Sequence, residues 1–162
     1  LLLSVFCFAQ NKIEREHRIL KAQFPATQYS IATLGEDIKK IKYYKEVDSA
    51  NTVYSLKFKK QRLKYQMDFT PKGQLKTISF DITEDDMESE VFDNITTRLS
   101  ENHYKYKILK MQQQYKVESR ETEAETFKNA FQNLILPSNV YKLTVKSKVK
   151  GKKAILFIYI MQ

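Results

Sequence analysis

Between residues 39 and 82 the chain alternates apolar and polar side chains with a period of two. Four runs show the pattern: Ile41–Val47, Tyr54–Phe58, Leu63–Phe69 and Ile78–Ile82. A period of two is typical of a strand that buries one face and leaves the other in water. The turn sequence Pro71-Lys72-Gly73 separates the last two runs. The pattern therefore predicts a four-stranded antiparallel meander with one buried and one open face.

Helical spacing appears on both sides of these strands. Residues 13–24 and 27–38 carry apolar side chains three and four positions apart, and Pro25 separates the two segments. Residues 83–103 show the same spacing after an acidic first turn, which suits the positive end of a helix. We expect a helix in each of these three segments.

The last third of the chain returns mainly to strands. A strand is predicted at residues 104–115, and a short helix over Phe127–Leu134 ends before Pro137. Two closing strands follow at residues 140–149 and 154–160. This order of elements predicts an α+β fold in which helices cover one face of an antiparallel sheet.

The order helix, strand, hairpin occurs twice, and the local sequence of two strands also matches. Val53–Lys59 has the sequence VYSLKFK and Val140–Lys146 has VYKLTVK. Tyr/Lys-rich strands also look alike through composition alone, but the shared order of elements favours a tandem repeat. We expect one repeat in residues 10–82 and a second in residues 83–162. The second lacks a final strand, so we expect a truncated C-terminus.

The first nine residues, LLLSVFCFA, are almost entirely apolar, and no charge appears before Lys12. The run is too short to span a bilayer, which needs about 20 residues. Its length suits the hydrophobic region of a secretory signal, with Ala9 at the cleavage position. We therefore expect residues 1–9 to be a truncated signal peptide. The protein would be exported to the periplasm or beyond, without stable membrane insertion after cleavage; a buried first strand is the alternative.

Composition limits the class of protein. The chain has 162 residues, of which 42% are hydrophobic and 29% charged, a mixture typical of a soluble globular protein. Its one cysteine, Cys7, excludes an internal disulfide framework and a cysteine-rich zinc module. Phe6 precedes this cysteine, which argues against a lipoprotein signal.

Several segments resemble the secreted bacterial PepSY-like proteins, a family that includes a group described as β-lactamase-inhibitor-like. Beside the N-terminal signal, they are KIKYYKEVDS (40–49), YSLKFKK (54–60), DFTPKGQL (68–75) and YKYKILKMQQQY (104–115). The resemblance covers most of residues 13–160. It implies two PepSY-like units, each a helix packed on an antiparallel β-meander, and export from the cell. It carries no catalytic motif, and the inhibitor-like name implies a fold rather than inhibition of a particular enzyme.

No catalytic or metal-binding motif is recognisable. His17 and His103 have no further ligands at zinc spacing, and no GxSxG nucleophile elbow is present. The three glycines are isolated, which excludes a phosphate-cradling loop. The acidic run Thr83–Glu88 lacks the glycine and the spacing of a calcium loop and suits a helix start better. We predict no enzyme activity, no cofactor and no metal; an enzyme with a non-standard site is the alternative.

The net charge of +9 is distributed unevenly. Residues 39–64 hold nine Lys and Arg against two acids, whereas residues 81–101 hold eight acids against one arginine. Alternation places many of the lysines on the strand face opposite the apolar residues. The candidate binding face consists of Lys42, Tyr44, Lys57, Lys59, Lys64, Gln66, Lys105, Lys107, Lys142 and Lys146.

A basic sheet face attracts anionic partners through long-range electrostatics. The predicted function is therefore an exported, non-catalytic binding or inhibitor-like module for an acidic protein or an envelope polyanion. Nucleic acid is disfavoured by export, by the scarcity of arginine and by the lack of a recognition motif. One alternative is that the lysines only keep the face soluble and discourage edge pairing. The other is a structural protein that self-associates through its apolar C-terminal strand.

Overall fold

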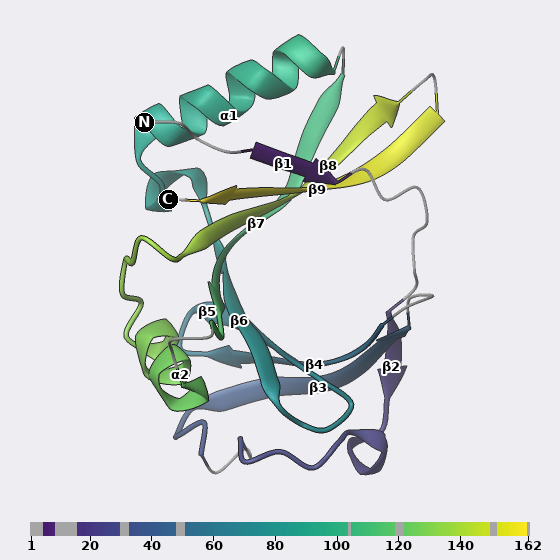
Figure 1. The fold of residues 1–162 in the computed structure, drawn as a ribbon, viewed down its shortest axis with the longest axis vertical. Helices are drawn as coiled ribbons and strands as arrows, with labels where there is room; N and C mark the ends of the chain where they lie inside the picture. The colour runs from purple at the N-terminus through teal and green to yellow at the C-terminus, as the bar shows by residue number, and fades with distance from the viewer. Residues whose placement is uncertain are drawn as a thin grey trace. The chain divides into compact units, whose positions relative to one another are not determined.

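The computed structural model describes residues 5–8, 16–29, 33–47, 51–103, 105–118, 122–149 and 152–161. The described residues form nine β-strands, two α-helices and two short 3-10 helices (Figure 1). The strands are β1 (Val5–Phe8), β2 (His17–Ile19), β3 (Ile38–Val47), β4 (Thr52–Lys60), β5 (Leu63–Phe69), β6 (Leu75–Ile82), β7 (Tyr106–Lys116), β8 (Val140–Val149) and β9 (Lys152–Met161). The helices are η1 (Lys21–Gln23), η2 (Glu84–Asp86), α1 (Ser89–Asn102) and α2 (Glu123–Phe131).

The described strands follow a single hydrogen-bonded order, β1-β9-β8-β7-β6-β5-β4-β3-β2. From β2 to β6 each strand pairs antiparallel with the next one along the chain, and β8 and β9 form an antiparallel hairpin. Strands that follow one another in the chain through short connections usually lie side by side in a sheet, and these strands do so.

The prediction of two PepSY-like units, each a helix packed on its own meander, is wrong. β7 is hydrogen-bonded to β6 on one side and to β8 on the other, so the strands belong to one order rather than to two sheets. The described residues before β3 contain no α-helix, and the order helix, strand, hairpin does not occur twice. The physical reason is that strand pairing is settled by long-range hydrogen bonds, which a local resemblance between two segments does not determine.

The predicted helices at residues 13–24 and 27–38 are also absent wherever these segments are described. His17–Ile19 pairs with β3 as strand β2, and only one 3-10 turn follows it. A helix of about 12 residues is marginal in water, so pairing with an available sheet edge outweighs its weak intrinsic preference. Gly35, at φ +89°, and Asp37, at φ +65°, further interrupt the second segment.

The four strands predicted from the period-two pattern correspond to β3, β4, β5 and β6. The helix predicted at residues 83–103 begins later, because α1 starts only at Ser89. Before it, Asp86 Oδ2 accepts hydrogen bonds from the backbone nitrogen and the hydroxyl of Thr83, at 2.7 and 2.8 Å. Such local side-chain bonds compete with helix formation and favour the short 3-10 turn η2.

The chain divides into two compact units. We call Glu14–Phe80 with Gln114–Leu136 the meander unit, and Leu1–Ile13, Asp81–Gln113 and Pro137–Gln162 the terminal unit. Two of the boundaries fall within strands, one in β6 after Phe80 and one in β7 after Gln113. The division that the sequence suggested at residues 82 and 83 stays a prediction.

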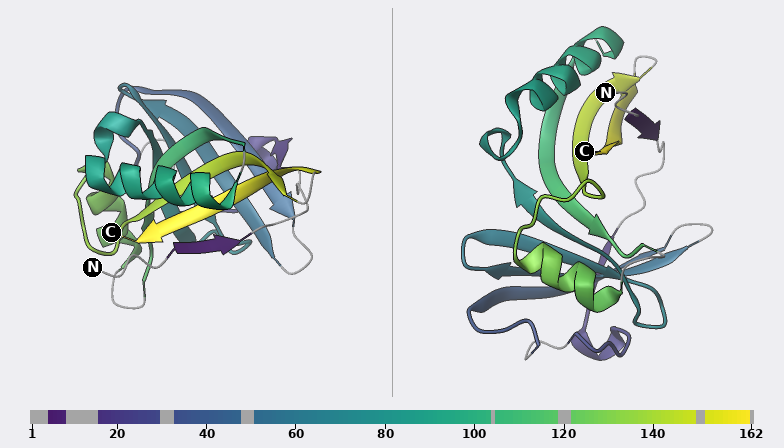
Figure 2. Two further views of the ribbon diagram at one scale, coloured as in Figure 1. Left: turned by 90° about the horizontal axis from the view of Figure 1, so that it is seen from above. Right: turned by 60° about the vertical axis from the view of Figure 1, so that its left-hand side comes forward.

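The core of the meander unit lies between one face of its strands and α2 (Figure 2). Met67, Phe69 and Ile78 are fully buried on that face. Phe131 of α2 stacks on Tyr65 of β5, with ring centroids 5.0 Å apart, and Phe127 stacks on Phe131 at 4.3 Å. Aromatic pairs of this kind contribute about 0.5–1.5 kcal/mol beyond the burial of the rings, so these contacts help to hold α2 on the sheet.

α2 begins with a capping box. The Thr122 hydroxyl accepts a hydrogen bond from the Glu125 backbone nitrogen, and the Glu125 carboxylate accepts one from the Thr122 backbone nitrogen at 2.8 Å. These bonds satisfy donors that a helix N-terminus otherwise leaves unpaired. They also hold the pKa of Glu125 below its usual value.

In the terminal unit, the apolar stripe of α1 faces the hairpin of β8 and β9. Leu143 and Val145 of β8 lie opposite Ile158 and Leu156 of β9, and all four side chains are buried. Ile95 and Leu99, one turn apart on α1, are buried as well. This stripe was part of the sequence prediction for residues 83–103.

β9 is paired on both sides, with β8 and with β1. The self-association alternative uses the apolar C-terminal strand as a sheet edge, and with Val5–Phe8 present that edge is covered by β1. Val5–Phe8 forms strand β1 and pairs with Phe157–Ile160. A strand in this segment was the alternative to the signal peptide in the sequence analysis. Signal cleavage after Ala9 concerns processing of the chain and stays a prediction. No described helix is long and apolar enough to cross a membrane.

A candidate binding face on the meander

The polar face is the set of side chains on β3, β4, β5 and β6 that alternate with the core residues beneath α2. Strand register sets which of them are neighbours, because directly opposed residues in an antiparallel pair point to the same side. Lys57 and Gln66 are opposed across β4 and β5, and they alternate with the buried Leu56 and Met67. The face is thus fixed by the same pairing that builds the core.

The register divides the polar face into three cross-strand rows. The lysine row consists of Lys39, Lys59 and Lys64. The middle row consists of Lys42, Lys57, Gln66 and Ser79. The Asp68 row consists of Tyr44, Ser55, Asp68 and Thr77. Cationic groups therefore gather at one end of the face and a carboxylate lies at the other.

Lys39 belongs to this face because β3 contains a bulge. Lys39 and Lys42 are three residues apart, so a regular strand would point them to opposite sides. The register shifts between them, and Lys40 takes a positive φ of 57°. A bulge adds one residue to one strand and re-aims the side chains that follow. Plain alternation had placed Lys40 rather than Lys39 on the polar face, so the sequence prediction missed this member of the lysine row.

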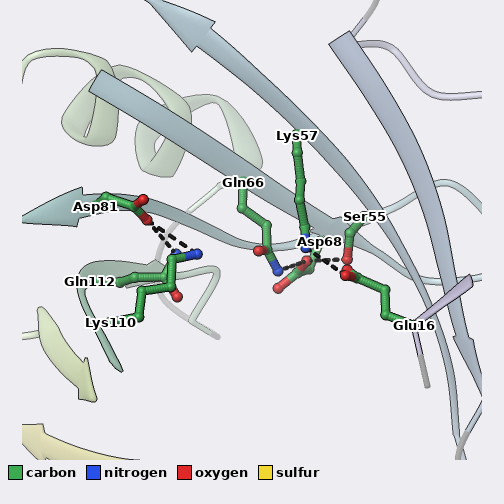
Figure 3. Close-up of polar contacts among 8 residues, drawn as sticks. All are labelled: Glu16, Ser55, Lys57, Gln66, Asp68, Asp81, Lys110 and Gln112. Atoms are coloured by element: carbon green, nitrogen blue, oxygen red, sulfur yellow. Dashed lines mark hydrogen bonds and ion pairs between the residues drawn. The ribbon is translucent and has the colours of Figure 1, made fainter. Parts of the chain in front are cut away.

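Asp68 is the centre of a hydrogen-bonded cluster (Figure 3). Its Oδ1 accepts from the Ser55 hydroxyl at 2.6 Å and from the Gln66 amide nitrogen at 2.9 Å. Its Oδ2 accepts from the Thr77 hydroxyl at 2.9 Å. Ser55 is only 2% exposed, so its hydroxyl depends on this carboxylate. Alternation had placed Asp68 on the polar face, but nothing in the sequence marked it as the acceptor for three donors.

Lys57 lies between a carboxylate and an aromatic ring. Its ammonium is 2.6 Å from Glu16 Oε2 (Figure 3). It also lies 4.5 Å from the ring centroid of Tyr44. Both side chains of the ion pair are about 30% exposed (31% and 28%), so solvent still screens the attraction. Glu16 comes from the segment before β2 and was not among the predicted site residues.

The structure brings together six of the ten predicted site residues. They are Lys42, Tyr44, Lys57, Lys59, Lys64 and Gln66, all on the polar face of the meander unit. Lys105, Lys107, Lys142 and Lys146 belong to the terminal unit. Whether any of these residues binds a partner stays a prediction.

In the terminal unit, Lys142 and Lys146 lie on the side of β8 opposite to the buried Leu143 and Val145. Lys142 lies opposite Tyr159, and its ammonium is 5.4 Å from the ring centroid of Phe157 and 5.7 Å from that of Tyr159. Lys105 and Lys107 flank Tyr106, whose hydroxyl donates to the Thr96 carbonyl of α1 at 3.3 Å. Lys105 and Lys107 are both exposed.

A second carboxylate contact lies in the terminal unit. Asp81 Oδ1 is 3.1 Å from the ammonium of Lys110 and accepts from the Gln112 amide nitrogen at 3.3 Å (Figure 3). Gln112 is 4% exposed, and this contact satisfies part of its hydrogen-bonding capacity. Asp81 belongs to β6, and Lys110 and Gln112 belong to β7.

The described residues contain no group of three or more His, Cys, Asp and Glu side chains able to hold a metal ion. His17 is exposed on β2 and His103 is half-buried at the end of α1, in the two different units. The tyrosines whose pKa is raised, Tyr29, Tyr43 and Tyr65, owe the shift chiefly to burial. None of the three belongs to the rows of the polar face.

Comparison with known proteins adds no family to this description. No protein-family model, no curated protein and no solved structure matches the chain. The PepSY-like resemblance therefore rests on the quoted segments alone and stays a prediction.

Proposed function

We propose that the chain is a non-catalytic binding module whose polar face on β3, β4 and β5 binds an acidic segment of another protein, and that it acts after export. The lysine row is the observation that carries this proposal. Lys39, Lys59 and Lys64 lie directly opposite one another on three adjacent strands, and Lys42 and Lys57 follow in the next row.

The lysine row forms a cationic strip across three strands. A segment that carries carboxylates at the spacing of these opposed lysines would be electrostatically complementary to the strip. This complementarity favours a bound anionic segment over the solubility alternative.

The rest of the face favours a protein over a polyanion. Asp68 lies two residues along β5 from Gln66, and Glu16 approaches Lys57 to 2.6 Å. A uniformly negative polymer laid across the face would meet these carboxylates. A protein segment with acidic residues at one end and hydrogen-bonding groups at the other matches both ends of the face.

The proposal is tested with the triple variant Lys39→Glu, Lys59→Glu and Lys64→Glu. Lys57 is left intact, because its replacement would leave Glu16 without its ion-pair partner. A matched control reverses three exposed lysines elsewhere: Lys72, Lys128 and Lys153. The two triple variants change net charge equally, so long-range effects cancel in the comparison.

The probe is an oligoglutamate peptide, with a sulfated polysaccharide as the polyanion probe, each titrated at low and at physiological ionic strength. We expect the lysine-row variant to weaken peptide binding about tenfold, since three lost contacts of about 0.5 kcal/mol each amount to about 1.5 kcal/mol. Equal losses in both triple variants, or no saturable peptide binding to the unaltered chain, would refute the proposal. Tighter binding of the polysaccharide than of the peptide would overturn the choice of a protein partner.

A further inference from the structure

The Lys57 side chain leaves its own row on the polar face. Its backbone belongs to the middle row, next to the lysine row, but its ammonium lies 4.5 Å from the ring centroid of Tyr44, which belongs to the Asp68 row. Glu16 Oε2 is 2.6 Å from this ammonium (Figure 3). In the free chain, one cation of the face is therefore paired with a carboxylate of the same chain, on the side away from the lysine row.

The same ammonium is also within reach of a partner bound along the lysine row. Neighbouring rows on one side of a strand are about 7 Å apart, because a strand rises about 3.3 Å per residue. A lysine carries its charge on a long and flexible aliphatic stem, so Lys57 can reach the row on either side of its own. A carboxylate of a bound segment beside Lys59 would therefore compete with Glu16 for the Lys57 ammonium.

The segment that carries Glu16 can move without disturbing the core. The strand that follows it, β2, has only three residues, His17–Ile19, and none of them is fully buried. In the described residues β2 is the last strand of the order and pairs only with β3. Local opening costs least where few apolar groups are buried. The core residues Leu56 and Met67 lie on the opposite face of the sheet and do not depend on the ion pair.

We propose that Glu16 is an internal competitor for the acidic partner of the polar face. In the free chain its carboxylate holds the Lys57 ammonium over Tyr44; a bound acidic segment takes over this ammonium, and Glu16 is released. A carboxylate on the same chain acts at a high effective concentration, so only a partner that presents several carboxylates together displaces it. This inference rests on the proposed function, because it concerns the same face and the same class of partner.

The test is the variant Glu16→Gln, titrated with the oligoglutamate peptide at low ionic strength. We expect it to bind the peptide about threefold more tightly than the unaltered chain, the gain from removing one partly exposed ion pair. Glu101→Gln is the matched control, because it removes the same charge from an exposed position in the terminal unit, and it should leave the affinity nearly unchanged. In a Lys57→Gln background, Glu16→Gln should give no gain.

Side-chain NMR follows Lys57 without relying on affinity. The ring current of Tyr44 should shift the ε-methylene signal of Lys57 upfield in the unaltered chain. This shift should decrease in Glu16→Gln, and it should decrease in the unaltered chain when the peptide saturates it. A Lys57 signal that is the same in the unaltered chain and in Glu16→Gln would overturn the proposal.

The affinities separate competition from a purely structural contact. If Glu16 only fastened β2 to the sheet, Glu16→Gln would bind the peptide equally well or more weakly, and this result would overturn the proposal. A gain that persists in the Lys57→Gln background, or that Glu101→Gln reproduces, would overturn it as well. The proposed function fails when the two triple lysine variants lose affinity equally, whereas the internal competitor fails when Glu16→Gln gains none, so the two failures are distinguishable.

Discussion

Replacing Asp68 with alanine tests whether the carboxylate cluster organises the polar face. The substitution removes the acceptor of three hydrogen bonds, from Ser55, Gln66 and Thr77. Gln66 and Thr77 are half-buried and can turn to water, whereas the Ser55 hydroxyl is almost fully buried and would lose its carboxylate partner. Hydrogen bonds to a charged group contribute about 1.5–3 kcal/mol each, and an unsatisfied buried donor costs about 1–3 kcal/mol. We therefore expect Asp68→Ala to lower the free energy of unfolding by about 3 kcal/mol.

Equilibrium urea unfolding measures this loss, with Asp93→Ala as the control. Asp93 is an exposed carboxylate on α1, and its removal should change stability by less than about 0.5 kcal/mol. The double variant Asp68→Ala with Ser55→Ala should recover about 1 kcal/mol, because the stranded hydroxyl is then absent. If Asp68→Ala were as stable as Asp93→Ala, the cluster would not hold the face together.

Three further predictions concern the meander unit and are checked by the same unfolding measurement. Phe69→Ala should cost about 3–5 kcal/mol, because the ring is fully buried in the core; a loss below about 1 kcal/mol would contradict this. Thr122→Ala should cost about 1 kcal/mol by removing half of the capping box. Because the pKa of Glu125 is lowered in the folded chain, its stabilising effect is present above the ordinary glutamate pKa of about 4.3. That effect should disappear as pH falls through the lowered value, and Thr122→Ala should flatten this acid dependence. Gly73→Ala should cost at least about 2 kcal/mol, because Gly73 has φ +78° and an added Cβ would lie 1.7 Å from the Ala26 carbonyl oxygen.

The polar face shows how far sequence reasoning reaches. Period-two alternation identified β3 to β6 and placed Lys42, Lys57 and Gln66 on one side, because the direction of a side chain along a strand depends only on its neighbours. The same reasoning missed Lys39, since the bulge that re-aims it forms only when β3 pairs with β4. It also overlooked Glu16, which reaches Lys57 from a segment 41 residues away in sequence.

The sequence by itself determined the local features of this protein: the positions of β3 to β6, the faces of regular strands, the apolar stripe of α1 and the separation of basic from acidic segments. Tertiary structure alone decided that His17–Ile19 is a strand instead of part of a helix, that β7 links β6 to β8 in one strand order, and that Glu16 forms an ion pair with Lys57. Periodicity is set by neighbours within a few residues. Pairing, bulges and long-range ion pairs depend instead on which distant segments meet and on how well their hydrogen bonds and side-chain volumes match.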